Sequence, residues 1–158
     1  MKFIAHRGLT NGPDKTKENH PSVILDAREN NFDCEIDLWV VYKNLWLGHD
    51  EPTYKISEDF LTIPGLWIHC KNTEALRYCS TRKNLNFFWH ENDAYTMTSQ
   101  GIVWSYPEKE TFDNVVKLMP EWKDPTFQNV FDKPCYGVCS DYVEKLRIIY
   151  SHLPNLDR

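Results

Sequence analysis

The sequence lacks the features that mark several common protein classes. No apolar run approaches the roughly 20 residues that a membrane-spanning helix needs. Lys and Arg are scattered along the chain without a basic block, and the cysteines include no Cys-x-x-Cys pair. The glycine motifs that cradle nucleotide phosphates and the GxSxG motif of serine hydrolases are also missing. These absences argue against an integral membrane protein, a zinc ribbon, a nucleotide-binding protein and a serine hydrolase.

Length, charge and cysteine content further limit the class of protein. The 158 residues are most simply one domain spanning 1–158, which is long enough to bury a core. The net charge of −5 argues against a nucleic-acid partner held through its phosphates. The five cysteines, an odd number, are expected to be reduced core residues. Because the first apolar run is too short for a secretory signal, we expect a cytoplasmic protein with no integral membrane association.

Hydrophobic periodicity gives a coarse map of secondary structure. Short apolar runs predict strands at 2–5, 32–41, 45–48, 66–70, 86–89, 95–98, 102–105 and 136–140. Helical spacing predicts helices at 21–29, 72–79, 112–118 and 142–153. Strand–helix alternation in the first half and at the end favours an α/β fold with largely parallel strands.

The number of strands predicts a reduced TIM-type (β/α) barrel with several crossover helices missing or shortened. A full barrel usually needs at least about 200 residues, and the strands between 86 and 105 lie too close together for crossover helices. In such sheets the chemistry gathers at the carboxyl ends of the strands.

Two carboxylates on one predicted strand form the first candidate site. Glu35 and Asp37 are separated by one residue, so both point to the same face about 7 Å apart, while Ile36 points the other way. Two carboxylates on an inner face repel each other and lose hydration, and a divalent cation such as Mg²⁺ or Ca²⁺ resolves both problems. The alternative is a solvent-facing strand, which the nearby apolar Phe32 and Trp39 make less suitable.

Two histidines follow other apolar runs. His6 ends the 2–5 strand and His49 follows the 45–48 strand. An imidazole titrates near neutral pH, so a pair can give and take protons while a phosphate ester is cleaved. Each histidine alone is more often structural, but beside Glu35 and Asp37 the pair points to catalysis.

Cationic and further polar residues mark the same strand ends. Arg7 offers a planar fork for phosphate oxygens, and Lys71 places an ammonium after the 66–70 strand. Glu18 lies just before the first helix, where it could complete a metal shell or simply favour the helix start. His90 follows the 86–89 strand and is a candidate substrate contact; Asp141 ends the last strand in the same manner.

Four segments together resemble the glycerophosphodiester phosphodiesterase family, within the wider phosphatidylinositol phospholipase C-like barrels. In the family's order and near its spacing, they are His6-Arg7-Gly8, Glu18-Asn19, Glu35-Ile36-Asp37 and His49-Asp50. The resemblance covers roughly the first third of the chain. Beyond it, Ile68-His69-Cys70-Lys71 looks like the family's strand ending in Glu-x-Lys, with His69 where a metal-binding Glu is common.

The resemblance implies a TIM-type barrel and assigns roles to the matching residues. They are an acid/base pair, His6 and His49; ligands of one divalent cation, Glu18, Glu35 and Asp37; and phosphate contacts, Arg7 and Lys71. In that family a substrate hydroxyl neighbouring the phosphate typically attacks it, giving a cyclic phosphodiester that water then opens. The chain is shorter than a typical member.

The expected function is therefore metal-dependent hydrolysis of a small glycerophosphodiester-like substrate, with Mg²⁺ or Ca²⁺ as cofactor. Two alternatives stay open. One is a phospholipase D-like lyase acting on lysolipids or sphingolipids; the other is a barrel that binds phosphoesters without cleaving them. Detection of a cyclic phosphate, release of choline, or binding without turnover would separate the three.

Overall fold

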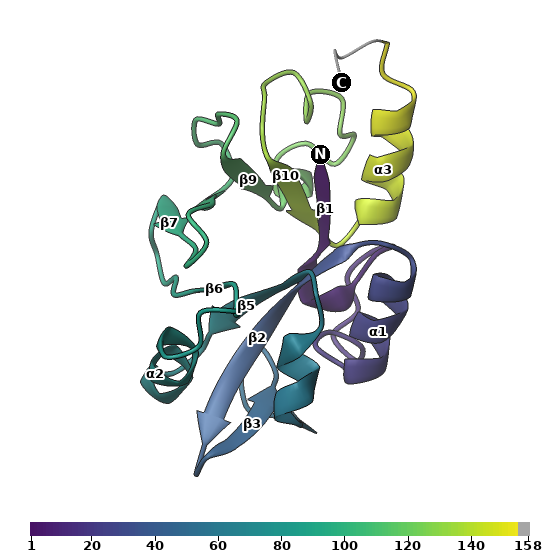
Figure 1. The fold of residues 1–158 in the computed structure, drawn as a ribbon. Helices are drawn as coiled ribbons and strands as arrows, with labels where there is room; N and C mark the ends of the chain where they lie inside the picture. Colours follow the sequence, from purple (N-terminus) through teal and green to yellow (C-terminus); the bar gives the residue numbers. More distant parts are fainter. Residues whose placement is uncertain (155–158) are drawn as a thin grey trace.

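The computed structural model describes residues 1–154, which form one sheet with a few helices (Figure 1). The strands are β1 (Lys2–Ala5), β2 (Asp33–Val41), β3 (Asn44–Leu47), β4 (Tyr54–Ile56), β5 (Leu66–Cys70), β6 (Phe87–Phe88), β7 (Tyr95–Met97), β8 (Val103–Ser105), β9 (Val115–Leu118) and β10 (Gly137–Ser140). The α-helices are α1 (Pro21–Glu29), α2 (Thr73–Ser80) and α3 (Val143–Ser151). Short 3₁₀ helices are η1 (His6–Gly8), η2 (Glu58–Thr62) and η3 (Pro120–Trp122).

The centre of the sheet is parallel. Strands β6, β5, β2, β1, β10, β9 and β8 pair in that order, each parallel to the next. Strands β3, β4 and β7 are antiparallel additions. The long strand β2 joins the parallel centre to the antiparallel additions. Its first residues pair with β1 and its last residues with β3 along one edge, and β5 pairs with it along the opposite edge.

The sheet is strongly curled, so that its two ends approach each other (Figure 1). The backbone N–H of Ser99, just after β7, donates to the carbonyl of Phe87 in β6 at 2.8 Å. The Phe87 N–H donates in turn to the Ser99 hydroxyl at 3.1 Å. This contact joins the two ends of the curled sheet and gives it a concave inner face.

The prediction of a reduced TIM-type barrel is wrong. The structure is a curled mixed sheet, and its described residues contain only the three α-helices α1, α2 and α3. The reason lies in the connections. The chain passes from β2 to β5 through the antiparallel strands β3 and β4, and it passes from β8 to β9 through a loop without a helix.

Most predicted elements are present, and one has the wrong type. The segment 112–118 was expected to be helical, but it contains the strand β9. Val115 and Val116 are fully buried, and β9 pairs with β8 on one side and β10 on the other. β-Branched side chains fit a buried strand better than a helix, so sheet pairing decides the structure here.

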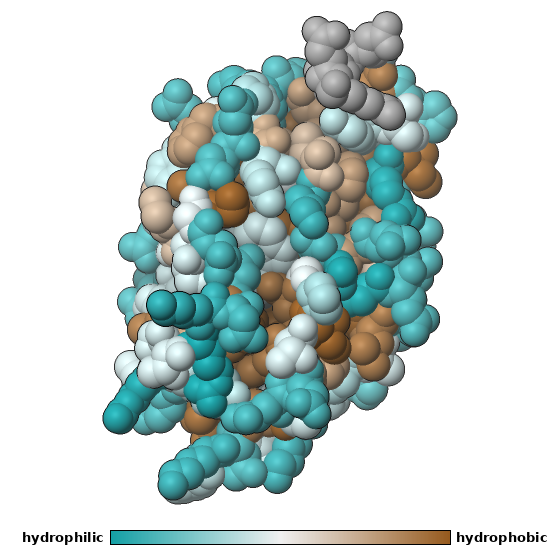
Figure 2. All heavy atoms as spheres, in the orientation of Figure 1, coloured by the Kyte–Doolittle hydropathy of each residue, from teal (hydrophilic) through white to brown (hydrophobic). Residues whose placement is uncertain are grey.

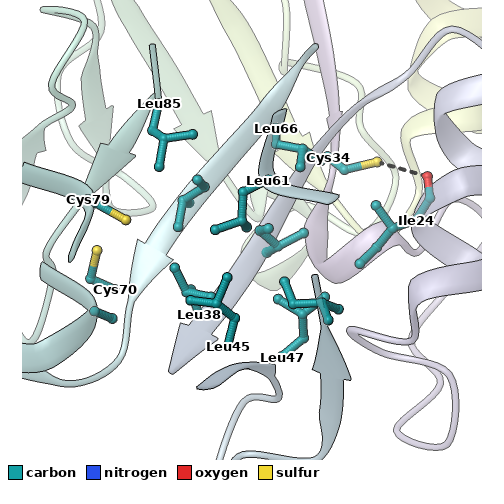
Figure 3. Packing of buried hydrophobic residues seen from close by; sticks show 14 of the residues in the cluster. Ile24, Cys34, Leu38, Leu45, Leu47, Leu61, Leu66, Cys70, Cys79 and Leu85 are labelled. Carbon is teal, nitrogen blue, oxygen red and sulfur yellow. Dashed lines mark hydrogen bonds between the residues drawn. The ribbon is translucent and has the colours of Figure 1, made fainter. Parts of the chain in front are cut away.

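Two apolar clusters lie on opposite faces of the sheet. On the outer face, side chains of β2 and β5 such as Ile36 and Ile68 pack with residues of α1 and α2, and Figure 3 shows part of this cluster. On the inner face, Trp67, Phe88 and Trp104 form a second cluster. Because Ile36 faces outward, Glu35 and Asp37 face the concave side, as the alternation along a strand requires.

The five cysteines carry free thiols in the structure, and four of them are buried. The Cys34 thiol donates to the carbonyl of Ile24, and the sulfur atoms of Cys70 and Cys79 face each other in the core (Figure 3). Burial raises the pKa of Cys34 to about 12, so this thiol is unreactive near neutral pH.

Among residues 1–154 no helix has the length and apolar character that crossing a bilayer requires. On the face shown in Figure 2, hydrophobic atoms lie mainly in recesses between hydrophilic ones.

Candidate functional site

One cavity lies at the carboxyl ends of the parallel strands, on the concave side of the sheet. Its volume is about 340 Å³. It is lined by polar and charged residues from β1, β2, β5 and the following loops: His6, Arg7, Glu35, Asp37, His49, His69, Lys71, His90 and Glu91. It is also lined by apolar and aromatic residues, namely Phe88, Trp104, Tyr106, Leu118, Met119 and Trp122. Of the residues that the sequence nominated for a site, all but Glu18 and Asp141 line this cavity.

The acidic pair is deeply buried beside cationic groups. Glu35 and Asp37 are only 3% and 1% exposed. Around Asp37, His69 Nδ1 lies 3.0 Å, Lys71 Nζ 3.4 Å and Arg7 Nε 3.3 Å from its carboxylate oxygens. Glu35 accepts the backbone N–H of Arg7 at 3.1 Å. Burial that would be costly for two carboxylates is thus offset by neighbouring positive charge.

The two carboxyl groups differ in acidity. Burial would raise the pKa of Asp37, but the hydrogen bond from His69 and the charge of Lys71 outweigh it and hold the pKa well below its usual range. Burial and the adjacent charge of Asp37 raise the pKa of Glu35. Ionisation of both carboxyl groups at once is therefore unfavourable, and a divalent cation between them would stabilise the doubly ionised pair.

Asn19 holds Asp37 in place. Its side-chain amide donates to Asp37 Oδ2 at 2.8 Å, and its carbonyl accepts the Asp37 backbone N–H at 2.9 Å. Asn19 is completely buried and has a positive φ of 60°, a conformation that Asn tolerates better than most residues. The sequence singled out Glu18 of this dipeptide, whereas the structure gives the contact with the acidic pair to Asn19.

Glu18 itself lies against Arg7, whose Nη1 donates to its carboxylate at 2.8 Å. The group of ligating atoms close enough to hold one ion is formed by Glu35, Asp37 and His69, with these atoms within 4.8 Å of one another. The structure thus uses Glu18 to orient Arg7. Its role as a metal ligand, expected from the resemblance, stays a prediction without support from this geometry.

His69 occupies a defined position between these groups. Its Nδ1–H donates to Asp37 Oδ1 at 3.0 Å, and its Nε2–H donates to the carbonyl of His90 at 3.2 Å. Its ring stacks on Phe88 with 5.1 Å between centroids and an interplanar angle of 4°. Both ring nitrogens thus face oxygen atoms, those of the Asp37 carboxylate and of the His90 carbonyl. A cation bound at this place would be ligated by a ring nitrogen in place of one of these contacts.

His6 and His49 enter the cavity from different segments. The Nδ1–H of His6 donates to Asp141 at 2.8 Å, which fixes the ring at the end of β1. His49 Nδ1–H donates to Asp50 at 2.7 Å in the loop after β3. Gly48 is needed before it, because φ is 154° there and an added Cβ would lie 2.0 Å from the carbonyl of Glu51.

The two imidazoles are shifted in opposite directions. Burial alone would lower the pKa of His6, but the hydrogen bond to Asp141 and the charge of Glu35 raise it above its ordinary value. Burial and the nearby charge of Arg7 lower the pKa of His49, and the charge of Asp37 only partly opposes them. At pH values between the two, His6 carries a proton and His49 does not, which is the arrangement an acid/base pair requires.

His90, a predicted substrate contact, lies beside this pair on the cavity wall. Its Nδ1 is buried and has no hydrogen-bond partner among the described residues, and the nearest carboxylate oxygen, of Asp93, is 3.9 Å away. A ring nitrogen in this state is available to a ligand.

The sequence patterns did not reveal the positions or contacts of four other residues. Asp141, which the sequence offers as a possible substrate contact at the end of the last strand, is the hydrogen-bond partner of His6 in the structure. Glu121, Tyr106 and Trp122 lie on or next to the cavity from the segment between β8 and β10, where no periodic pattern marked them. Only the residue types of Glu121, Tyr106 and Trp122 could have indicated a site, because residues in loops show no regular spacing.

Comparisons with known proteins give no further guidance, because neither a family model, nor a curated protein, nor a solved structure matches the chain significantly.

Proposed function

We propose that this protein is a metal-dependent phosphodiesterase that cleaves small glycerophosphodiester-like substrates, the chemistry of the family that its motifs resemble. One observation carries the proposal: His6 and His49, from separate segments, line one cavity together with Glu35 and Asp37. The curled sheet differs from the barrel of that family. The proposed chemistry depends only on the rim of parallel strands, which the curled sheet retains.

The residues divide into three tasks. Glu35 and Asp37, with His69 beside them, offer oxygen and nitrogen ligands that fit one divalent cation. Such an ion would orient the phosphate and balance the charge on its oxygens. Arg7 and Lys71 present positive charge to the same cavity and hold the non-bridging phosphate oxygens.

The two histidines move the protons. His49, neutral between the two pKa values, accepts the proton of the substrate hydroxyl next to the phosphate, and that oxygen attacks phosphorus. The bond from phosphorus to the leaving alcohol breaks, and protonated His6 donates its proton to the departing oxygen. The products are a cyclic phosphodiester and a free alcohol, and water opens the ring in a second step.

Turnover of a simple substrate tests the proposal. Phosphorus NMR of glycerophosphoethanolamine with the purified protein should show a cyclic phosphate or a monoester when Mg²⁺ or Ca²⁺ is present. EDTA should abolish the reaction. Turnover that resists EDTA, or full activity after His6→Ala or His49→Ala, would contradict it.

The alternatives give different results in the same experiment. A lysophosphatidylcholine substrate that releases choline with a cyclic phosphate would indicate the lyase. Calorimetric binding of phosphoesters without turnover across a wide panel would indicate a binding protein. One observation favours the binding protein: Arg7, Lys71 and His69 already form ion pairs with the Asp37 carboxylate without a bound ion.

A further inference from the structure

Two large aromatic side chains lie exposed at the cavity that holds the acidic pair. Tyr106 and Trp122 are 43% and 55% exposed, and their rings meet edge to face at 6.1 Å. Both line the cavity that holds His6 and His49. Exposed aromatic rings beside a cavity are surfaces on which a ligand can stack.

Trp122 also lines a second cavity, which borders the first at this side chain. This second cavity has a volume of about 400 Å³, and its other lining residues include Glu121, Asp141 and Lys145. Asp141 connects the two cavities, since it accepts the Nδ1–H of His6. A diester whose phosphorus lies near His6 therefore has room for a sizeable group beyond Trp122.

Glu121 is incompletely satisfied in this second cavity. Its Oε1 accepts the Ser140 hydroxyl at 2.8 Å and the Asp141 backbone N–H at 3.0 Å. Its Oε2 is buried and has no hydrogen-bond partner among the described residues. A buried acceptor without a partner is costly, and a donor brought by a ligand, such as a hydroxyl group, would remove that cost.

We propose that Trp122, Glu121 and Lys145 form a subsite for a sugar ring carried by one arm of the phosphodiester. The inference rests on the proposed function for the position of the phosphate and adds the substrate class. The apolar face of a sugar would stack on Trp122, while its hydroxyl groups would donate to Glu121 Oε2 and accept from Lys145.

The charges in this cavity favour a sugar over a quaternary ammonium group such as choline. Choline would also stack on Trp122, but it needs a negative counter-charge. Lys145 brings positive charge to the same cavity, and the carboxylate of Asp141 is already engaged by His6 at 2.8 Å. Burial and the charge of nearby Asp141 raise the pKa of Glu121. Its unpartnered Oε2 needs a hydrogen-bond donor, which a sugar hydroxyl supplies and a quaternary ammonium group does not.

Three substrates that differ only in the leaving arm test the proposal. They are glycerol phosphodiesters of glucose, ethanol and choline, compared by kcat/KM. The glucose diester should be preferred over the ethyl diester by about tenfold, and Trp122→Ala should reduce this preference about tenfold because the stacking surface is lost. Tyr42→Ala, a change at an aromatic residue 93% exposed on the β2–β3 turn, is the matched control and should leave the preference unchanged.

Calorimetry with glucose 1-phosphate separates failure of the subsite from failure of the proposed function. Binding of glucose 1-phosphate that weakens several-fold in Trp122→Ala and Glu121→Gln supports the subsite. If such binding is found but no diester is cleaved, the subsite stands and only the proposed phosphodiesterase function is contradicted. Equal turnover of the three diesters, a preference for choline, or glucose 1-phosphate binding that neither variant changes would overturn the subsite.

Discussion

The two walls of the cavity are built in opposite ways. The charged wall is formed by Arg7, Glu35, Asp37, His69 and Lys71. It stands on β2 and β5, which pair from Cys34 to Leu38, and on the segments that follow β1 and β5. The aromatic wall, formed by Phe88, Trp104, Tyr106 and Trp122, stands on the short strands β6 and β8 and on loops.

The contrast extends to contacts. On the charged wall, Arg7, His69 and Lys71 each lie within 3.4 Å of the Asp37 carboxylate. Glu35 accepts the backbone N–H of Arg7 at 3.1 Å. On the aromatic wall the inner rings, Phe88 and Trp104, are buried and stacked at 4.8 Å, but the outer two are exposed. The charged wall is preorganised for a fixed chemical step, while the exposed rings of the outer aromatic wall can contact different substituents of a substrate.

The largest expected effect is at the histidines beside the charged wall. His6→Ala and His49→Ala should each lower kcat by roughly 10²- to 10⁴-fold, the usual contribution of general acid/base catalysis. A circular-dichroism melt would show that both variants fold. His152→Ala, which removes an exposed histidine outside the cavity, is the matched control and should retain full turnover.

A better leaving group would distinguish the two histidines. Nitrophenolate leaves without protonation, so a glycerol nitrophenyl phosphodiester should restore much of the rate of His6→Ala. His49→Ala should stay inactive, since the attacking hydroxyl still needs a base. Equal rescue of both variants would contradict the assignment of His6 as acid and His49 as base.

Charge balance makes the charged wall sensitive to a neutral substitution. Asp37→Asn leaves Arg7, Lys71 and His69 without their buried counter-charge and should lower the free energy of unfolding by about 3–5 kcal/mol, as measured by urea denaturation. Asp93→Asn, at an exposed carboxylate near the aromatic wall, should change it by less than about 0.5 kcal/mol. Similar losses in both variants would remove the contrast between the walls.

The pH dependence tests the contact between His6 and Asp141. Asp141→Asn should lower the pKa of His6, so the alkaline limb of the activity profile should move to lower pH. Because the folded protein raises this pKa, the stability that the contact contributes is full below pH of about 6.5 and is lost as pH rises through the folded value. An unchanged profile and an unchanged stability curve would show that Asp141 does not govern His6.

The smallest effect on stability is expected at the outer aromatic wall. Tyr106→Ala should change the free energy of unfolding by less than about 1 kcal/mol, because the ring is 43% exposed. Trp104→Ala, in the buried part of the same wall, should cost about 3–5 kcal/mol. Thermal denaturation of the two variants would measure the difference, and a large loss at Tyr106 would mean that the outer wall is structural.

The sequence predicted the charged wall better than the aromatic one, for a physical reason. Residues at strand ends follow a rule: parallel strands bring their carboxyl ends to one edge, so His6, Glu35, Asp37 and Lys71 could be placed together before the structure was known. The contacts that fix them could not, since Asn19 reaches Asp37 from a loop with a positive φ.

The curl of the sheet could not be predicted from sequence patterns either. Its far side consists of strands of two to four residues, such as β6 and β9, which are too short to show a period. The segment Val115–Leu118 illustrates this, because its apolar run fits a helix or a strand equally until its neighbours β8 and β10 are known. Where tertiary pairing decides the structure, local sequence is insufficient.

The position of a bound ion and phosphorus tests the central claim most directly. A crystal grown with Ca²⁺ and a non-cleavable phosphonate analogue of a glycerophosphodiester should show the ion in contact with Glu35 and Asp37, and phosphorus between His6 and His49. An analogue bound outside this cavity, or an ion that touches neither carboxylate, would contradict the proposed chemistry.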